Sequence, residues 1–396
     1  MNTPSRIKPL DGLRAFAIFL VILYHGLINV ENIEWVLNHQ AHFDIKHIIF
    51  SGWVGVDLFF VLSGFLIGSK LLTNYINISY LKTFIIKRFF RIAPAYYFCV
   101  CLTLLRLHLL PAIFKGTFLQ TLQLYSLPFL AHIIFLQDYV WSEPHIDWVF
   151  WSIPIEMKFY LILPFIILTM NKIQTPEAKT LILVASYIIY VIARTINIDM
   201  IFEGQSVTLF YFSNNVRLPF HLSLDGLWIG VICAYYSQTR HFEDLGNKTL
   251  NIVFCAGLVL FFLCTAYLSA FTQSDILLSD FEQKYKIPLV NLAFGLILIS
   301  SVKGCFASNF LSSKVLWFIA KISYSLYLTH AFGMMLNEVL IKTLFQHFES
   351  YMLCWLIALP IYLGFCLIPA YLLHELVEMP CINYAKQKFA KKETAS

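Results

Sequence analysis

The sequence predicts an all-α fold: a polytopic membrane helix bundle of about ten transmembrane helices plus one re-entrant or interfacial helix, with both termini cytoplasmic. Hydrophobic residues make up 59% of the 396 residues and charged residues only 13%. The mean hydropathy of +0.71 lies outside the range of soluble domains. Apolar runs long enough to cross a bilayer recur along the chain. Topology explains where the positive residues lie, so the net charge of +5 predicts no nucleic-acid partner.

The apolar runs place the expected spans in order along the chain. Their approximate bounds are 10–30, 48–72, 89–110, 150–170, 180–197, 217–236, 250–270, 287–302, 315–340 and 351–373. We expect residues 1–380 to form one integral-membrane domain, because spanning helices use up nearly all of this length. Residues 381–396 are expected to form a basic cytoplasmic tail.

The placement of lysine and arginine orients these spans. Arg6 and Lys8 put the N-terminus inside, and a basic segment at 70–91 follows two spans later. The basic tail should also be inside, which requires an even number of spans. A further apolar stretch at 117–137 would export that tail if it crossed fully. We therefore predict a re-entrant or interfacial helix there, with an eleventh span as the alternative.

The first span contains a permanent cation and a titratable base. Arg14 and His25 are eleven residues apart, so they lie on nearly the same helix face, about 16 Å apart along the axis. Ionisable side chains inside a span are costly and usually functional. The pair predicts chemistry along a path through the membrane, with His25 as a general base. The alternative is a histidine that only packs between helices.

Two carboxylates are expected at the depth of His25. Asp57 and Glu156 each enter the outer third of a span that runs inward. A carboxylate beside the imidazole would satisfy both buried groups and fix the tautomer of the base. The structural alternatives are an arginine partner for Asp57 and a hydrogen-bond anchor role for Glu156.

Further polar residues in the spans are candidates for stabilising an oxyanion or binding an acceptor. These candidates are Trp151, Arg217, Ser323, Tyr324 and His330. Arg217 also belongs to a row with His221 and Asp225, spaced every four residues and therefore expected on one helix face. That row would line an acceptor groove or form a polar face that satisfies itself.

No metal site is predicted. His39, His42 and His47 cluster outside the membrane but lack a defined ligand spacing. The nine cysteines show no metal spacing either, and most fall within apolar runs, as small hydrophobic residues do.

The inner side carries a candidate cofactor site. Arg88 and Arg91 are three residues apart and project from one helix face. Their planar guanidinium groups suit phosphate oxygens. With Arg14 they are predicted to hold an anionic, phosphate-rich cofactor, and the distance from Arg14 to His25 is comparable with an extended pantetheine arm. The alternative is that these cations only set the topology.

These residues lie in motifs that resemble acyltransferase family 3, the integral-membrane acyltransferases that modify bacterial surface glycans and other acceptors. The matching segments are 10–15 with His25 closing an Arg-x10-His pattern, 55–67, 88–96, 151–164, 322–330 and 378–380. They cover nearly the whole chain. One departure is Ala320, which stands where the family often has glycine.

The resemblance implies about ten helices, a cytoplasmic acyl-CoA donor and transfer to a hydroxyl group. It implies that His25 is essential to catalysis and that Arg14, Arg88 and Arg91 bind the donor. The predicted protein is a multi-pass O-acyltransferase of the bacterial inner membrane, surrounded by membrane lipid. It would move an acetyl group from acetyl-CoA to a surface glycan such as lipopolysaccharide O-antigen or exopolysaccharide. The sequence does not identify the acceptor, and capsule and peptidoglycan are equally compatible.

Other functions and routes stay open at this point. The protein is alternatively a flippase or transporter of lipid-linked sugars, an acyltransferase for a small lipophilic acceptor, or a membrane sensor. An acyl-histidine intermediate on His25 competes with direct transfer as the chemical route. The sequence does not indicate an oligomeric state.

Overall fold

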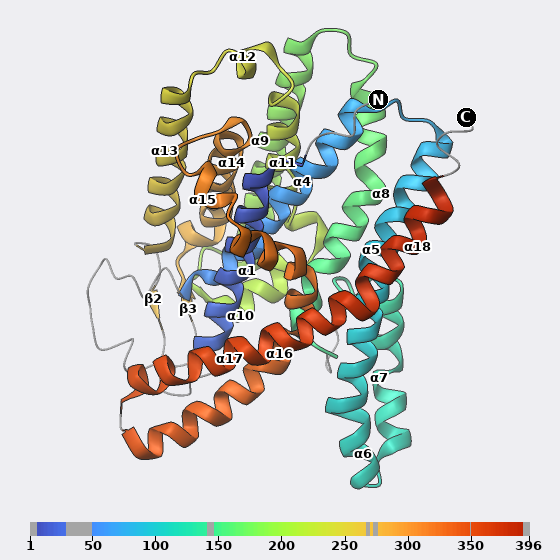
Figure 1. The fold of residues 1–396 in the computed structure, drawn as a ribbon, viewed down its shortest axis with the longest axis vertical. Helices are drawn as coiled ribbons and strands as arrows, with labels where there is room; N and C mark the ends of the chain where they lie inside the picture. The colour runs from blue at the N-terminus through green and yellow to red at the C-terminus, as the bar shows by residue number, and fades with distance from the viewer. Residues whose placement is uncertain are drawn as a thin grey trace.

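The computed structural model describes residues 6–28, 50–140, 146–266, 270–271, 276–348 and 350–390. Long helices packed side by side make up most of this part of the chain (Figure 1). They are α1 (Lys8–Ile28), α4 (Gly55–Thr73), α5 (Ile78–Thr103), α8 (Ser152–Met170), α9 (Pro176–Phe202), α13 (Asn247–Ala266), α14 (Ile287–Lys303), α16 (Lys314–Phe348) and α17 (Tyr351–Leu373).

Shorter helices connect or extend the long ones. They are α6 (Leu110–Phe114), α7 (Phe118–Ile133), α10 (Leu209–Phe212), α11 (Asp225–Tyr236), α12 (Arg240–Glu243), α15 (Ser308–Leu311) and α18 (Met379–Ala390). The extended exception is a small antiparallel sheet in the order β1-β3-β2, from β1 (Val207–Thr208), β2 (Ala270–Phe271) and β3 (Ile276–Leu278).

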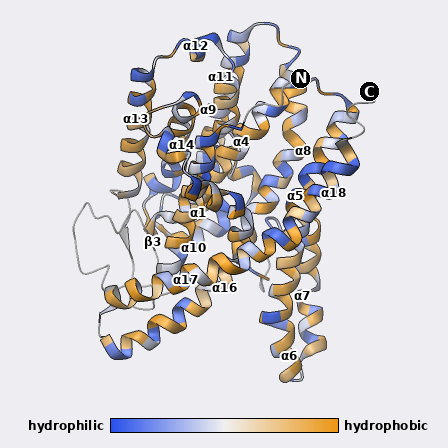
Figure 2. Ribbon diagram, in the orientation of Figure 1, coloured by the Kyte–Doolittle hydropathy of each residue, from blue (hydrophilic) through white to orange (hydrophobic). Residues whose placement is uncertain are grey.

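The prediction of an all-α membrane protein is confirmed. Within the described ranges, eight helical segments are long and apolar enough to cross a membrane. They are 8–26, 52–73, 78–114, 148–170, 176–202, 247–266, 282–303 and 353–389. Hydrophobic residues cover most of the length of these helices, and hydrophilic residues gather in the upper connections (Figure 2). The segments at 217–236 and 315–340 are the predicted spans that these eight do not include.

The predicted span at 217–236 is wrong as one continuous helix. A π-helical turn ends at Arg217, a 3-10 turn covers Phe220–Leu222, and the regular helix α11 begins only at Asp225. Pro219 accounts for the break, because proline lacks an N–H group and disfavours helical geometry at the residue before it. Pro219 is therefore the feature of the sequence that predicts this break.

The stretch at 117–137 forms α7, which packs back against α5. The hydroxyl of Tyr97 on α5 donates to the carbonyl of Ile133, and the hydroxyl of Tyr96 lies 2.6 Å from Nδ1 of His132. The two helices form a hairpin with α6 at its tip (Figure 1). With 16 residues, α7 is short for a full span. The re-entrant or interfacial assignment stays a prediction.

The number of crossings stays a prediction, and so does its parity. The start of α1 and the end of α18 both lie in the upper half of Figure 1. Part of the segment predicted as a tail is helical, since α18 runs to Ala390 and packs on α5 through Tyr384 and Phe90. Which side of the membrane these ends face stays a prediction.

Candidate active site

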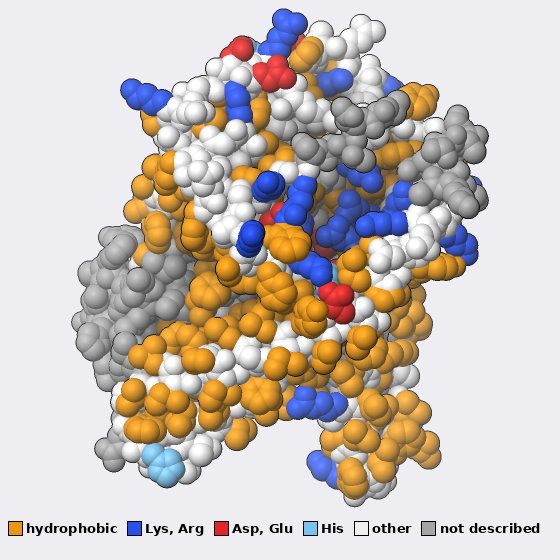
Figure 3. All heavy atoms as spheres, in the orientation of Figure 1, with side chains coloured by type: hydrophobic (Ala, Val, Ile, Leu, Met, Phe, Trp, Pro, Cys, Tyr) orange, Lys and Arg blue, Asp and Glu red, His pale blue; other side chains and the backbone are white. Residues whose placement is uncertain are grey.

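A cavity of about 270 Å³ lies among α1, α4, α5, α8 and α16. It is slightly below the usual size range of small-molecule sites. Its polar lining residues are Arg14, Ser63, Arg88, Arg91, Ser152, Glu156, Tyr160, Ser323, Tyr324 and Tyr327. Apolar residues such as Phe59, Phe60 and Ile153 line the remainder. Figure 3 shows Lys and Arg gathered above a broad apolar area on one face of the molecule.

The three arginines predicted to bind the donor share this cavity. Arg88 and Arg91 lie one turn apart on α5, and Arg14 comes from α1. Within the described residues, none of the three forms an ion pair with a carboxylate. The guanidinium group of Arg88 lies 5.6 Å from the ring centroid of Tyr160 and is thereby held in place. With one carboxylate, Glu156, against three cations, the lining favours an anionic ligand.

Glu156 lies in this cavity and not beside His25. Its Oε1 accepts hydrogen bonds from the hydroxyls of Ser63 and Tyr160, which are themselves 2.8 Å apart. The expected contact between Glu156 and His25 is therefore not formed. The alternative of a hydrogen-bond anchor describes this geometry better.

Asp57 also has a different partner from the one expected. Both of its carboxylate oxygens accept from Arg217, at 3.0 and 2.9 Å, and Oδ1 lies 3.3 Å from the amide nitrogen of Asn291. The side chain is buried. Asp57 thus neutralises an arginine, and it forms no hydrogen bond to His25 in the described part of the chain.

His25 lies near the end of α1 and is not one of the residues that line the cavity. Its Nδ1 is 2.9 Å from the carbonyl oxygen of Val21, so the ring must donate there and the lone pair of the neutral ring is on Nε2. The ring packs against Trp148 and His330, with centroids 5.1 and 4.8 Å away. Tyr327 lines the cavity and lies 5.7 Å from His330, which connects the two regions.

A capped 3-10 turn positions the aromatic side chains around these groups. The Asp147 carboxylate accepts from the N–H of Val149 and so begins the turn Trp148–Trp151. Trp148 lies against His25, and the ring centroid of Trp151 lies 4.9 Å from the guanidinium carbon of Arg217. One short turn therefore contacts both the histidine and the buried ion pair.

Of the residues predicted to stabilise an oxyanion or bind an acceptor, some line the cavity and others do not. Ser323 and Tyr324 line the cavity, but their hydroxyls donate to the carbonyls of Ala320 and Ile92. Tyr327 was not singled out, yet it lies at the same cavity and bonds to Ser152. Trp151 packs outside the cavity lining, on Phe60 and Arg217.

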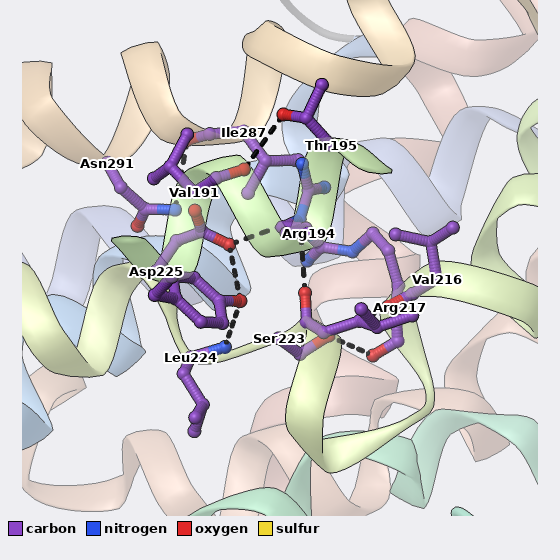
Figure 4. A network of polar contacts seen from close by, with 12 residues as sticks. Val191, Arg194, Thr195, Val216, Arg217, Ser223, Leu224, Asp225, Ile287 and Asn291 are labelled. Carbon is purple, nitrogen blue, oxygen red and sulfur yellow. Dashed lines mark hydrogen bonds and ion pairs between the residues drawn. The ribbon is translucent and has the colours of Figure 1, made fainter. Parts of the chain in front are cut away.

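The row of Arg217, His221 and Asp225 does not lie on one helix face, because the chain breaks at Pro219. Arg217 pairs with Asp57 and His221 lies 3.0 Å from the hydroxyl of Tyr139. Asp225 turns to α9, where it accepts from Tyr190 and lies 3.5 Å from Arg194 (Figure 4). Neither an acceptor groove nor a shared polar face results.

A model of a known family matches most of the chain. The model is described as an acyltransferase domain and covers residues 7–375. The protein belongs to the acyltransferase 3 family. The resemblance drawn from the motifs is thereby confirmed, and a multi-pass membrane acyltransferase accounts for both the helices and the buried charges.

Two relatives of this acyltransferase are O-acetyltransferases by name. It is 27% identical over 346 residues to O-acetyltransferase OatA of Staphylococcus aureus, covering 83% of this chain and 51% of that protein. It is 26% identical over 336 residues to peptidoglycan O-acetyltransferase OatA of Listeria monocytogenes, covering 82% and 49%. The chain spans about half the length of these curated relatives. No solved structure matches it.

The acyltransferase also has a buried arginine that the sequence reading missed. Arg194 on α9 is almost fully buried and donates to the carbonyls of Leu222 and Lys284. Figure 4 shows Arg194 beside Asp225. It ties α9 to the segments before α11 and α14. Arg194 falls inside a predicted span, so the reasoning that selected Arg14 would have selected it as well.

Within the described ranges, the acyltransferase has no group of three or more His, Cys, Asp or Glu side chains placed to hold a metal ion. His39, His42 and His47 lie outside the described residues.

Proposed function

We propose that this acyltransferase is a membrane O-acetyltransferase that moves an acetyl group from cytoplasmic acetyl-CoA to a hydroxyl of a cell-surface glycan. The observation that supports it most is the arginine-lined cavity with Tyr327 in its wall. The ring centroid of His330 lies 5.7 Å from that of Tyr327, and the ring centroid of His25 lies 4.8 Å from that of His330. The phosphates of the donor would meet Arg14, Arg88 and Arg91, and its thioester would point toward His25.

The proposed reaction uses His25 as the base. Its Nε2 takes the proton of the acceptor hydroxyl, whose oxygen attacks the thioester carbonyl, and the proton leaves with the coenzyme A thiol. General-base assistance of this kind typically contributes 10²–10⁴-fold to the rate. An acyl group first carried by His25 is the competing route.

The acceptor follows from the relatives more than from the site. The Listeria relative is named for peptidoglycan, so we examine peptidoglycan first and then lipopolysaccharide O-antigen and exopolysaccharide. We propose the bacterial inner membrane as the location, with acetyl-CoA entering from the cytoplasm.

Donor binding is tested first with the purified full chain in detergent. Acetyl-CoA at about 100 times its Kd should stabilise the folded protein by about 2.7 kcal/mol. The variants Arg88→Ala and Arg91→Ala should lose most of this stabilisation. Arg240→Ala is the control, because Arg240 is exposed on α12, outside the cavity lining. A protein that acetyl-CoA does not stabilise would point to the transporter or sensor alternatives.

Transfer is tested in cells. Ester-linked acetate is measured on each isolated surface polymer from a deletion strain that produces either the wild-type chain or His25→Ala. We expect one polymer to gain ester-linked acetate with the wild-type chain and none to gain it with His25→Ala. Transfer by His25→Ala at a normal rate would exclude both chemical routes.

A further inference from the structure

His25 and His330 form a pair of imidazoles with matching bonding. His330 Nδ1 lies 2.7 Å from the carbonyl oxygen of Tyr327, as His25 Nδ1 lies 2.9 Å from that of Val21. Each Nδ1 therefore donates within its own helix, which leaves the lone pair of each neutral ring on Nε2. Two lone-pair nitrogens thus belong to rings whose centroids are 4.8 Å apart.

The two rings differ in access. His25 is 7% exposed, whereas His330 is fully buried and its Nε2 has no hydrogen-bond partner in the described part of the chain. A buried acceptor without a donor is costly, and such groups require an explanation. A proton brought in by the neighbouring ring would provide the missing donor.

The helices hold this pair in place. A Cβ on Gly26 would lie 2.6 Å from the ring of Tyr362, so glycine allows α1 to approach α17 closely. Tyr362 donates to the carbonyl of Ile22, and Asn337 on α16 donates to the carbonyl of Gly26. Both histidines therefore lie on a junction of three helices with little freedom to separate.

No carboxylate stabilises a protonated His25 in the described structure. The two expected partners are bonded elsewhere, Asp57 to Arg217 and Glu156 to Ser63 and Tyr160. A base that becomes an imidazolium in a water-poor site needs an acceptor for its new N–H group. His330 is the neighbouring side chain with an unused acceptor.

We propose that His330 is a positioning residue that accepts a hydrogen bond from Nε2–H of His25 once His25 has taken the proton of the acceptor hydroxyl. The inference rests on the proposed O-acetyl transfer. The acceptor O–H bond breaks as the His25 N–H bond forms, and the new O–acyl bond forms as the thioester C–S bond breaks. The proton, held between the two rings, then passes to the departing sulfur, so both histidines end neutral.

The test compares variants that keep or remove the acceptor. His330→Gln offers an amide oxygen, whereas His330→Leu offers none. We expect His330→Leu to deposit ester-linked acetate about 100-fold more slowly per folded protein, and His330→Gln to remain within about 10-fold of wild type. Stabilisation of the purified chain by acetyl-CoA should be unchanged in both, because donor binding does not involve His330. His330→Phe, a planar ring without a lone pair, serves as the second variant if His330→Leu does not fold.

Met334→Leu is the packing control, one turn further along α16 and also buried. It should deposit acetate at the wild-type rate. The proposal would be overturned if His330→Gln and His330→Leu lost the same amount of transfer activity, because the shape of the side chain and not its acceptor would then matter. It would also be overturned if His330→Leu transferred acetate at the normal rate, because transfer would then not depend on His330. Absence of transfer by the wild-type chain is a separate outcome, which would refute the proposed function itself.

Discussion

Arg217 shows how this bundle keeps a permanent charge away from water. Its guanidinium carbon lies 4.9 Å from the ring centroids of both Trp53 and Trp151, and its nitrogens bond both oxygens of Asp57. The cation is thus paired with a carboxylate through two hydrogen bonds and lies over two indole rings, contacts that suit the planar guanidinium group better than an ammonium group. Trp151 ends the 3-10 turn that begins with Trp148, so this cluster also holds the turn whose Trp148 packs against His25.

Removing one member of this ion pair should destabilise the protein strongly. Asp57→Leu leaves the charge of Arg217 buried and unpaired, and Arg217→Met leaves the charge of Asp57 buried and unpaired. Each change typically lowers the free energy of unfolding by about 3–5 kcal/mol. The double variant Asp57→Leu/Arg217→Met should recover most of the loss, because no charge is left without a partner. Unfolding in detergent measures all three free energies in a double-mutant cycle. Additive losses in the double variant would contradict a direct coupling.

At the scale of elements, glycine sets the distance between α4 and α11. A Cβ on Gly64 would overlap the carbonyl oxygen of Leu227, and one on Gly230 would overlap that of Val61. The obstacles are backbone atoms, so no side-chain rotation could make room. Small residues allow membrane helices to pack this closely. The crossing matters for the site because α4 carries both Asp57 and the cavity residue Ser63.

Gly230→Ala should therefore lower the free energy of unfolding by about 1–3 kcal/mol, the usual cost of forcing extra volume into a packed site. Gly364→Ala is the matched control, a helical glycine on α17 whose added Cβ meets nothing within 4 Å. It should be neutral or stabilising by up to about 1 kcal/mol, because alanine favours a helix over glycine. Equal effects of the two substitutions in a detergent unfolding assay would show that close packing at the crossing is unimportant.

At the scale of the whole molecule, the spans were predictable and the partners were not. A membrane helix is a local property of about 20 apolar residues, so one sequence is enough to find most of them. The partner of Asp57 depends on which helix lies beside it, and Arg217 is 160 residues away. The cationic cavity was partly predictable, because Arg88 and Arg91 are three residues apart and so project from one helix face. The position of Glu156 relative to His25 was not predictable, because it depends on how the helices are tilted and shifted along one another.

The orientation of the whole chain gives the last prediction. Reporter fusions placed in the connection at residues 74–77, between α4 and α5, and after residue 390 should both behave as cytoplasmic. Green fluorescent protein should fluoresce at both points and alkaline phosphatase should be inactive, because the basic segments at both points favour the inside. If 117–137 were a full span, the number of later crossings would change by one and the second fusion would be exported. An active phosphatase after residue 390 would thus make α7 an eleventh span and place the proposed donor cavity and the chain end on opposite sides.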